Sequence, residues 1–219
     1  RCTSHGLQYP EITGIDEPLP LEAVQGIAIR SLLELTAGYE TSNPRVNQLW
    51  SNLVWSNVDN FLSIPTDCPQ RNERMGWSGD ISVFSRTATY VSDADQFLTR
   101  HMIAMRDVQT EAGRFTDIAP VGGGFGGVLW GSAGITVPWE AYQQYGDSRL
   151  LEEHYEAMAA YIDYLDTTLG DEGLSSDNAL GDWLGPQNNQ LGSDFLVTAY
   201  HVYDLGIMAR TAELLGRDT

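Results

Sequence analysis

The connections between helical stretches constrain the fold of this chain most. From residue 43 onward, apolar residues recur with helical spacing, and the pattern predicts helices over about 44–62, 80–91, 94–111, 132–145, 148–168 and 194–215. Long loops alternate with tight turns between these helices, and the long loops are 63–79, 112–131 and 169–193. Because a tight turn makes consecutive helices antiparallel, the three long loops are expected at one end of the helical array. The sequence therefore predicts an all-α fold of six helices in three hairpins, with functional residues on the long loops.

Two prolines bear on where the helices begin. Pro44 follows Ser42 and Asn43, either of which can cap a helix, and it occupies the first-turn position that proline favours. Pro138 lies inside the fourth helical pattern, where it should kink the helix or mark its true start.

The first 39 residues have a different character. They are β-leaning and interrupted by proline and glycine. Residues 1–9 are typical of a strand without its partners, and partial alternation over 21–35 suggests one or two more strands. We therefore expect residues 1–39 to be the end of a preceding β-sandwich domain and its linker. Residues 40–219 would then belong to a helical domain, within a longer protein.

The charge of the chain excludes several classes of function. Thirty acidic residues face twelve basic ones, for a net charge of −18, which argues against nucleic acid or an anionic membrane as a partner. All the basic residues are arginine, so the chain lacks the lysine that a Walker-type phosphate loop, a Schiff-base enzyme or a kinase requires. No apolar run approaches the roughly 18 residues of a membrane-spanning helix.

Cysteine and histidine offer no metal-ligand pattern. Cys2 and Cys68 are far apart and show no zinc spacing, and a bridge between them cannot be read from sequence. The histidines are scattered, and we expect them to be structural residues: His5, His101, His154 and His201. We therefore expect neither a metal nor another cofactor.

The loop from Thr66 to Asp80 concentrates polar chemistry between two helices. Its acceptors are Asp67, Asn72, Glu73 and Asp80, and its donors are Arg71 and Arg74. Trp77 supplies a flat face suited to stacking on a sugar ring. Carboxylates beside an aromatic wall are what cleavage of a glycosidic bond requires. The plainer interpretation is a polar loop whose arginines neutralise its acids and whose Asp80 caps the next helix.

The order of residues in this loop is the more specific signal. Asp67-Cys68-Pro69-Gln70-Arg71, Glu73-Arg74, Gly76-Trp77 and Gly79-Asp80 closely resemble the signature of family 78 glycoside hydrolases, the α-L-rhamnosidases. The resemblance covers most of the chain, with further similar stretches at 5–9, 40–44, 63–66, 137–139, 145–147 and 181–184. It implies that residues 40–219 are the N-terminal part of an (α/α)6-barrel catalytic domain, about half of the toroid.

The resemblance also implies roles for individual residues. Glu73 would be the general acid of an inverting hydrolase of terminal α-L-rhamnosyl linkages, acting on a rhamnose-containing oligosaccharide or glycoside. The general base would lie beyond Thr219, in the remainder of the same domain, so the isolated chain is expected to be inactive. The residues that hold the sugar would be Asp67, Arg71, Trp77, Asp80, Trp130 and Trp183.

Two features of these residues complicate the assignment. Arg71 and Arg74 should lower the pKa of Glu73, whereas a general acid needs a raised pKa from burial or from neighbours such as Asp67. In addition, this chain reads Trp130-Gly131-Ser132-Ala133 where Trp-Gly-Asp-Ala is expected in many relatives.

Plainer interpretations stay open for several residues. Trp77 could be a core residue, and Trp183 could anchor its loop. The glycines of 121–127 lack the lysine of a phosphate loop and suggest a mobile loop over the site. At the level of function, the alternatives are a non-catalytic helical carbohydrate-binding piece and an α/α-toroid hydrolase for another sugar.

Overall fold

Six long helices and one single-turn helix make up most of the described structure, a computed structural model that describes residues 6, 9–31, 34–176, 180–181 and 192–218. Their bounds are α1 Pro44–Asn60, α2 Ser78–Val91, α3 Asp95–Asp107, α4 Val128–Gly131, α5 Ala133–Tyr145, α6 Arg149–Asp166 and α7 Ser193–Leu215. The six predicted helices are therefore confirmed to within a few residues at each end, and α4 is an additional turn before the fourth.

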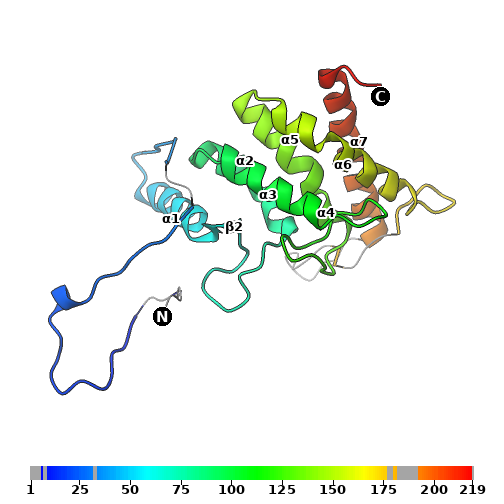
Figure 1. Cartoon of the computed structure of the whole chain (residues 1–219). Coiled ribbons are helices and arrows are strands. Elements are labelled where there is room, and N and C mark those ends of the chain that lie inside the picture. The colour runs from blue at the N-terminus through cyan, green and yellow to red at the C-terminus, as the bar shows by residue number, and fades with distance from the viewer. Residues whose placement is uncertain (1–5, 7–8, 32–33, 177–179, 182–191, 219) are drawn as a thin grey trace.

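Helix α5 forms the centre of the structure. It contacts α2 and α7 on either side within one layer, and it also contacts α3 and α6, which lie next to each other in a second layer (Figure 1). Its first six residues, 133–138, are all buried, because small and branched side chains let neighbouring helices approach closely. The core around α5 includes Ile81, Met102, Phe115, Val137, Met158 and Leu165.

The long loops and the short turns lie at different ends of this array. The loop before α2 and the loop before α4 are joined by backbone hydrogen bonds, from Ser78 N to Asp117 O (2.8 Å) and from Ala119 N to Gly76 O (3.1 Å). The two short turns are joined to each other through Tyr145, whose hydroxyl accepts a hydrogen bond from Ala94 N at 2.9 Å. The prediction of a common rim is thus confirmed for the first two long loops, whereas most of the third falls outside the described residues.

Helix α1 begins where its capping signals predict. Asn43 Oδ1 accepts a hydrogen bond from Arg45 N at 3.0 Å, and Pro44 is the first helical residue. The helix ends in a short antiparallel hairpin of β1 (Phe61–Leu62) and β2 (Ile64–Pro65), which pairs Phe61 with Pro65 and leads into the signature loop.

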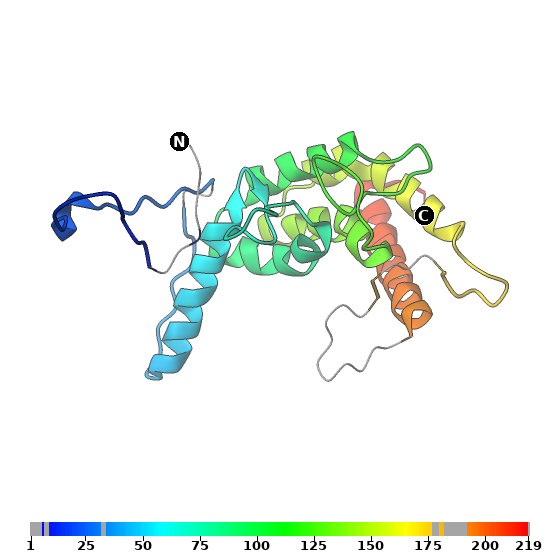
Figure 2. The same cartoon turned by 90° about the horizontal axis from the view of Figure 1, so that it is seen from below.

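The predicted strands of the N-terminal segment are not found among the described residues. Residues 9–31 are all exposed and contain only a 3-10 turn, η1 at Leu21–Ala23, while Leu35 forms one isolated bridge to Ser92. The segment runs away from the helices in both views (Figures 1 and 2). A strand needs a partner that bonds its backbone over several residues, and in the described part of the chain this segment makes only isolated backbone bonds to the helical part, such as Ser31 N to Phe61 O (2.9 Å) and Thr36 N to Val91 O (3.0 Å). The strand predicted at 1–9 lies almost wholly outside them.

Two expectations about helix starts are corrected. Asp80 is the third residue of α2 and not its cap, because Trp77 occupies the N-cap position and bridges to Ile118. Pro138 does not mark the start of α5, which begins five residues earlier at Ala133. Because proline has no N–H, Pro138 cannot donate the usual helical hydrogen bond to the Gly134 carbonyl. This carbonyl interacts instead with His154 and raises the pKa of its ring.

Three histidines are buried, as expected for structural residues. Burial lowers the pKa of His101 and of His154 to about 3, with Arg100 and Arg106 respectively adding to the effect. Neither ring nitrogen of His101 has a hydrogen-bond partner in the described structure. No helix among the described residues combines the length and hydropathy needed to cross a membrane.

Candidate active site

The signature loop closes on itself between β2 and α2. Asp67 N donates to Met75 O at 3.0 Å, and Met75 N donates back to Asp67 Oδ1 at 3.2 Å. Arg74 has a left-handed backbone, with φ of 47°, and its Nε donates to Pro69 O at 3.0 Å. These bonds turn the chain so that residues 67–75 form a compact loop that includes Glu73.

Glu73 is held by two other residues of the signature. Oε2 accepts hydrogen bonds from Arg71 Nε (2.9 Å) and from its terminal nitrogen (2.5 Å). Oε1 accepts from the indole Nε1 of Trp77 at 3.0 Å. The side chain of Glu73 keeps 33 % of its surface exposed, so the carboxylate is fixed in orientation and open to a ligand.

Arg71 lowers the pKa of Glu73 and burial raises it, and the lowering is the larger effect. The hydrogen bond from Arg71 is the largest influence and lowers the pKa of Glu73, and hydrogen bonds with Asp67 and Trp77 act in the same direction. Burial raises this pKa, but less than the hydrogen bonds lower it. The arrangement is that of an ionised Glu73, and a proton on Oε2 requires Arg71 to release it.

Asp80 has the opposite electrostatics. Partial burial raises the pKa of its carboxyl, and the charges of Asp67 and Glu73 add to the rise. Since Asp80 is in the first turn of α2, its carboxylate also faces the positive end of that helix.

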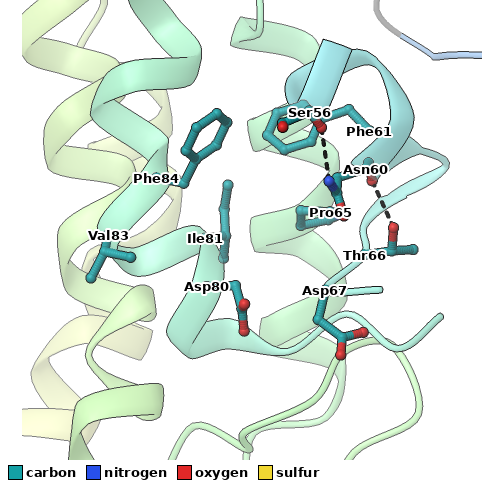
Figure 3. Close-up of a pocket in the computed structure, with 10 residues that line it drawn as sticks. All are labelled: Ser56, Asn60, Phe61, Pro65, Thr66, Asp67, Asp80, Ile81, Val83 and Phe84. Carbon is teal, nitrogen blue, oxygen red and sulfur yellow. Dashed lines mark hydrogen bonds between the residues drawn. The ribbon is translucent and has the colours of Figure 1, made fainter. Parts of the chain in front are cut away.

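Asp67 and Asp80 stand together at a cavity of about 270 Å³ between α1 and α2 (Figure 3). Phe61, Pro65, Ile81 and Phe84 give the cavity apolar walls, and Figure 3 places the two carboxylates at one end of it. A site with apolar walls and a few polar groups is typical of small-ligand sites.

Trp130 is a wedge between two glycines. It is 9 % exposed, and a Cβ at Gly79 would lie 2.7 Å from its Nε1. A Cβ at Gly126 would lie 2.2 Å from its Cδ2, so both glycines are required by close approach. Trp130 thus packs against both the start of α2 and the glycine loop, residues 121–127, while its role as a wall of a sugar pocket stays a prediction. Trp183, the other predicted wall, lies outside the described residues.

The glycine loop carries an aromatic residue that sequence reasoning missed. Phe125 is 58 % exposed and meets the ring of Trp77 edge to face, with ring centroids 5.3 Å apart. The loop is held by Asp117, a buried residue also missed, whose Oδ2 accepts a hydrogen bond from Gly126 N at 2.8 Å. The available signal for Phe125 was a single aromatic residue within a glycine run.

Of the predicted site residues, the structure brings Asp67, Arg71, Glu73, Trp77 and Asp80 into one region. Trp77 is half-buried with its N–H donated to Glu73, so it is not part of the core, while its role in sugar binding stays a prediction. Trp130 packs against Gly79 at the start of α2, next to this region, and against Gly126 of the glycine loop.

One group of side chains could be considered for a metal. The ligand atoms of Asp67, Cys68 and Glu73 lie within 4.8 Å of one another. Burial and the neighbouring Asp67 raise the pKa of the Cys68 thiol to about 11, so it stays protonated, and Glu73 is already bound by Arg71 and Trp77. This donor set does not fit a metal, and we assign none.

Comparison with known proteins places this chain in a family. Residues 34–219 match the family model described as the bacterial alpha-L-rhamnosidase 6 hairpin glycosidase domain. An α-L-rhamnosidase of Streptomyces avermitilis is 41% identical over 220 residues, a match that covers 100% of this chain and 21% of the relative. This chain therefore spans about a fifth of the length of that relative, and its six long helices amount to half of the six hairpins of an (α/α)6 toroid.

Two crystal structures support the same placement. That of a Streptomyces avermitilis α-L-rhamnosidase complexed with L-rhamnose has a TM-score of 0.77 and 42% identity, over 82% of this chain and 17% of that chain. That of a native α-L-rhamnosidase from Aspergillus terreus has a TM-score of 0.85 and 33% identity, over 92% of this chain and 25% of that chain.

Proposed function

The chain belongs to the family of bacterial α-L-rhamnosidase six-hairpin glycosidase domains, and on this premise we propose that it supplies the general acid and much of the sugar pocket of an inverting α-L-rhamnosidase. Its substrate is a glycoside or oligosaccharide with a terminal α-L-rhamnosyl group. The observation that carries the proposal is Glu73, oriented by Arg71 and Trp77 with its carboxylate within 4.8 Å of that of Asp67, which lines the cavity together with Asp80.

In the proposed reaction, Glu73 donates its proton to the glycosidic oxygen as the bond from that oxygen to the anomeric carbon breaks. A water molecule, activated by a second carboxylate about 6.5–9.5 Å away, attacks the anomeric carbon from the opposite face and inverts its configuration. We place this base in the remainder of the domain, outside residues 1–219.

The Arg71 contact suggests how Glu73 acquires its proton. While Arg71 is bound to Oε2, the pKa of Glu73 is lowered and the carboxylate is ionised. When a substrate hydroxyl, or a water bound to a carboxylate, accepts the hydrogen bonds of Arg71 in place of Glu73, the contact that lowers the pKa of Glu73 most is lost. Substrate binding also excludes water, and this raises the pKa further. Trp77 stays on Oε1 and keeps the carboxyl aimed.

Exchange of Glu73 tests this role in the complete protein. Glu73→Gln should lower the rate of release of rhamnose from natural rhamnosides by about 10²–10⁴-fold, the usual contribution of a general acid. An aryl rhamnoside with a good leaving group should be affected less. The thermal unfolding midpoint should not change, and Glu111→Gln, on an exposed loop, is the matched control. Undiminished hydrolysis of natural substrates by the glutamine variant would remove Glu73 from the mechanism.

A second function is favoured by one observation. A glutamate whose pKa is lowered by a bound arginine is suited to accept hydrogen bonds from sugar hydroxyls, so the same residues could bind rhamnose without cleaving a bond. Calorimetric binding of L-rhamnose by the complete protein, with no product from aryl or natural rhamnosides, would favour this function. Turnover of a different glycoside in a substrate panel would instead favour an α/α-toroid hydrolase for another sugar.

We also propose that residues 1–39 are the end of a preceding β-sandwich domain and its linker, and that residues 40–219 begin the catalytic domain. The exposure of residues 9–31 supports this division, as does the start of the family match at residue 34.

A further inference from the structure

Ser132 has one hydroxyl hydrogen and two neighbours that could accept it. It is fully buried at the junction of α4 and α5. Its Oγ lies 3.0 Å from Val128 O and 2.5 Å from Asp204 Oδ2. A hydroxyl has one hydrogen to donate, so both contacts can be full hydrogen bonds only if one of them is donated by the other partner. Val128 O is a carbonyl and cannot donate, which leaves Asp204.

Asp204 is placed where a charged carboxylate would be costly. It belongs to α7 and is 0 % exposed. Its second oxygen, Oδ1, has no hydrogen-bond partner in the described part of the chain. An ionised Asp204 would therefore bury a charge with one oxygen unsolvated, whereas a protonated carboxyl satisfies Ser132 as a donor.

We propose that Asp204 is a buried, protonated carboxylic acid, and that its O–H donates to Ser132 Oγ while Ser132 donates to Val128 O. This chain of two hydrogen bonds connects α7 to both ends of the single turn α4. Tyr161 of α6 donates to the same Val128 carbonyl at 3.0 Å, so α6 and α7 both bond to this turn.

The surroundings of Asp204 agree with a neutral acid. Burial is the largest influence and raises its pKa, and Ser132 is the influence that opposes it. On the same helix, burial also raises the pKa values of the phenols of Tyr200 and Tyr203. Two charged residues of neighbouring helices, Glu140 of α5 and Arg86 of α2, act on Tyr203 and are not among the causes of the pKa shift at Asp204.

The position of α4 matters because it carries Trp130. That ring separates Gly79, in the signature, from Gly126, in the glycine loop that brings Phe125 to Trp77. Asp204 is thus a positioning residue for the site, and this role, unlike its protonation, rests on the proposed function.

Thermal unfolding of the complete protein tests the protonation without reference to activity. In unfolded chains aspartate has a pKa of about 3.9, so above that pH the unfolded state of the natural protein releases a proton that the folded state retains. Stability from this group is therefore lost as pH rises, by about tenfold in the unfolding equilibrium constant per pH unit, until the folded pKa is passed.

Asp204→Asn keeps the shape and a donor for Ser132 but cannot ionise. Its melting temperature should exceed that of the natural protein by a margin that widens as pH rises from 4.5 to 8. Asp163→Asn, an exposed position on α6, should show no widening. A constant margin, or a natural protein that is the more stable at neutral pH, would mean that Asp204 is ionised and would overturn the proposal.

The positioning role has its own test. Asp204→Ala removes the donor and should raise the KM for an aryl rhamnoside and weaken binding of L-rhamnose. Asp204→Asn should restore both. If the alanine variant does not fold, Ser132→Ala breaks the same connection and should show the same weakening. If a folded Asp204→Ala variant keeps the KM and the rhamnose affinity of the natural protein, the positioning role is overturned. Absence of any rhamnose binding by the natural protein would overturn it together with the proposed function, while the unfolding result would stand.

Discussion

The pairing of Arg71 with Glu73 sets the charge of the residue on which the proposed chemistry depends. The two residues are separated by one position in a loop, and both terminal groups are reachable by solvent. Exposed ion pairs of this kind contribute little to folding stability. The hydrogen bond by which Trp77 orients Glu73, and the lowered pKa of Glu73, are therefore better explained by function than by stability.

Replacement of Arg71 should move the pH profile of the complete enzyme. In Arg71→Gln the largest lowering influence on Glu73 is lost, so the pKa of that carboxyl rises. Because a general acid works in its protonated form, activity falls as pH rises through this pKa, and the alkaline limb should move to higher pH. KM should also rise, since Arg71 is a predicted sugar contact.

The chain offers a matched control for this substitution. Arg149 pairs with Asp147 at the same spacing, also at an exposed position, in the turn between α5 and α6 at the other end of the helices. Arg149→Gln should leave the pH profile unchanged. An alkaline limb that does not move in Arg71→Gln would show that Arg71 does not govern the protonation of Glu73 during turnover.

At the level of elements, the one-turn helix α4 connects the parts of the site. Trp130 lies against Gly79 of α2 and Gly126 of the glycine loop, while Ser132 and Val128 connect the turn to α7 and α6. Close contacts of this kind leave no room for an added methyl group.

Gly79→Ala should therefore destabilise the protein although alanine is the better helix former. Alanine gains about 1 kcal/mol over glycine within a helix, but here its Cβ would lie 2.7 Å from Trp130 Nε1. Overpacking of a filled core costs about 1–3 kcal/mol, so we expect a lower free energy of unfolding in urea titration.

A double-mutant cycle isolates this contact. In a Trp130→Leu background the space is free, and Gly79→Ala should then become neutral or stabilising. An alanine variant that is stabilising in the natural background would show that the start of α2 can move away from Trp130 at little cost.

Sequence alone anticipated the elements better than their junctions. The period of apolar residues and the Asn43-Pro44 signal identified α1 and the other long helices, because these signals are local. The start of α2 was misplaced because Trp77 bridges to Ile118, a contact between segments distant in sequence. The expected strands of the N-terminal segment failed for the same reason, since strands depend on partners that periodicity does not reveal.

The site shows the same division between local and distant signals. The family-like order of residues 67–80 located Asp67, Arg71, Glu73, Trp77 and Asp80 in one region. It did not reveal the cradle of glycines around Trp130, the support from Asp117 or the contact of Phe125 with Trp77. Nor could spacing decide between Arg71 and burial as the stronger influence on Glu73, which required the geometry.

For the whole molecule, the layer formed by α2, α5 and α7 presents apolar side chains to solvent. Val83 of α2 and Phe195, Val202 and Tyr203 of α7 are 70 %, 63 %, 65 % and 48 % exposed. Such a surface usually marks a contact with another part of a protein. It is consistent with a chain that spans about a fifth of the length of its α-L-rhamnosidase relative.

We therefore expect residues 1–219 alone to be inactive on an aryl rhamnoside under conditions in which the complete protein turns over. The reason is that the general base of the proposed mechanism lies outside this chain. Circular dichroism should establish that the isolated chain is helical before the assay. Appreciable turnover by the isolated chain would place the base within residues 1–219 and require another carboxylate here to be assigned that role.

The indole N–H of Trp77 donates a hydrogen bond to one oxygen of Glu73. A fluorophore is thereby hydrogen-bonded to the carboxylate that gains and loses a proton in each cycle of the proposed mechanism. Loading, protonation and release at this carboxylate should each perturb the electric field across the ring, so the site carries its own intrinsic optical probe and its occupancy can be followed in real time without a label.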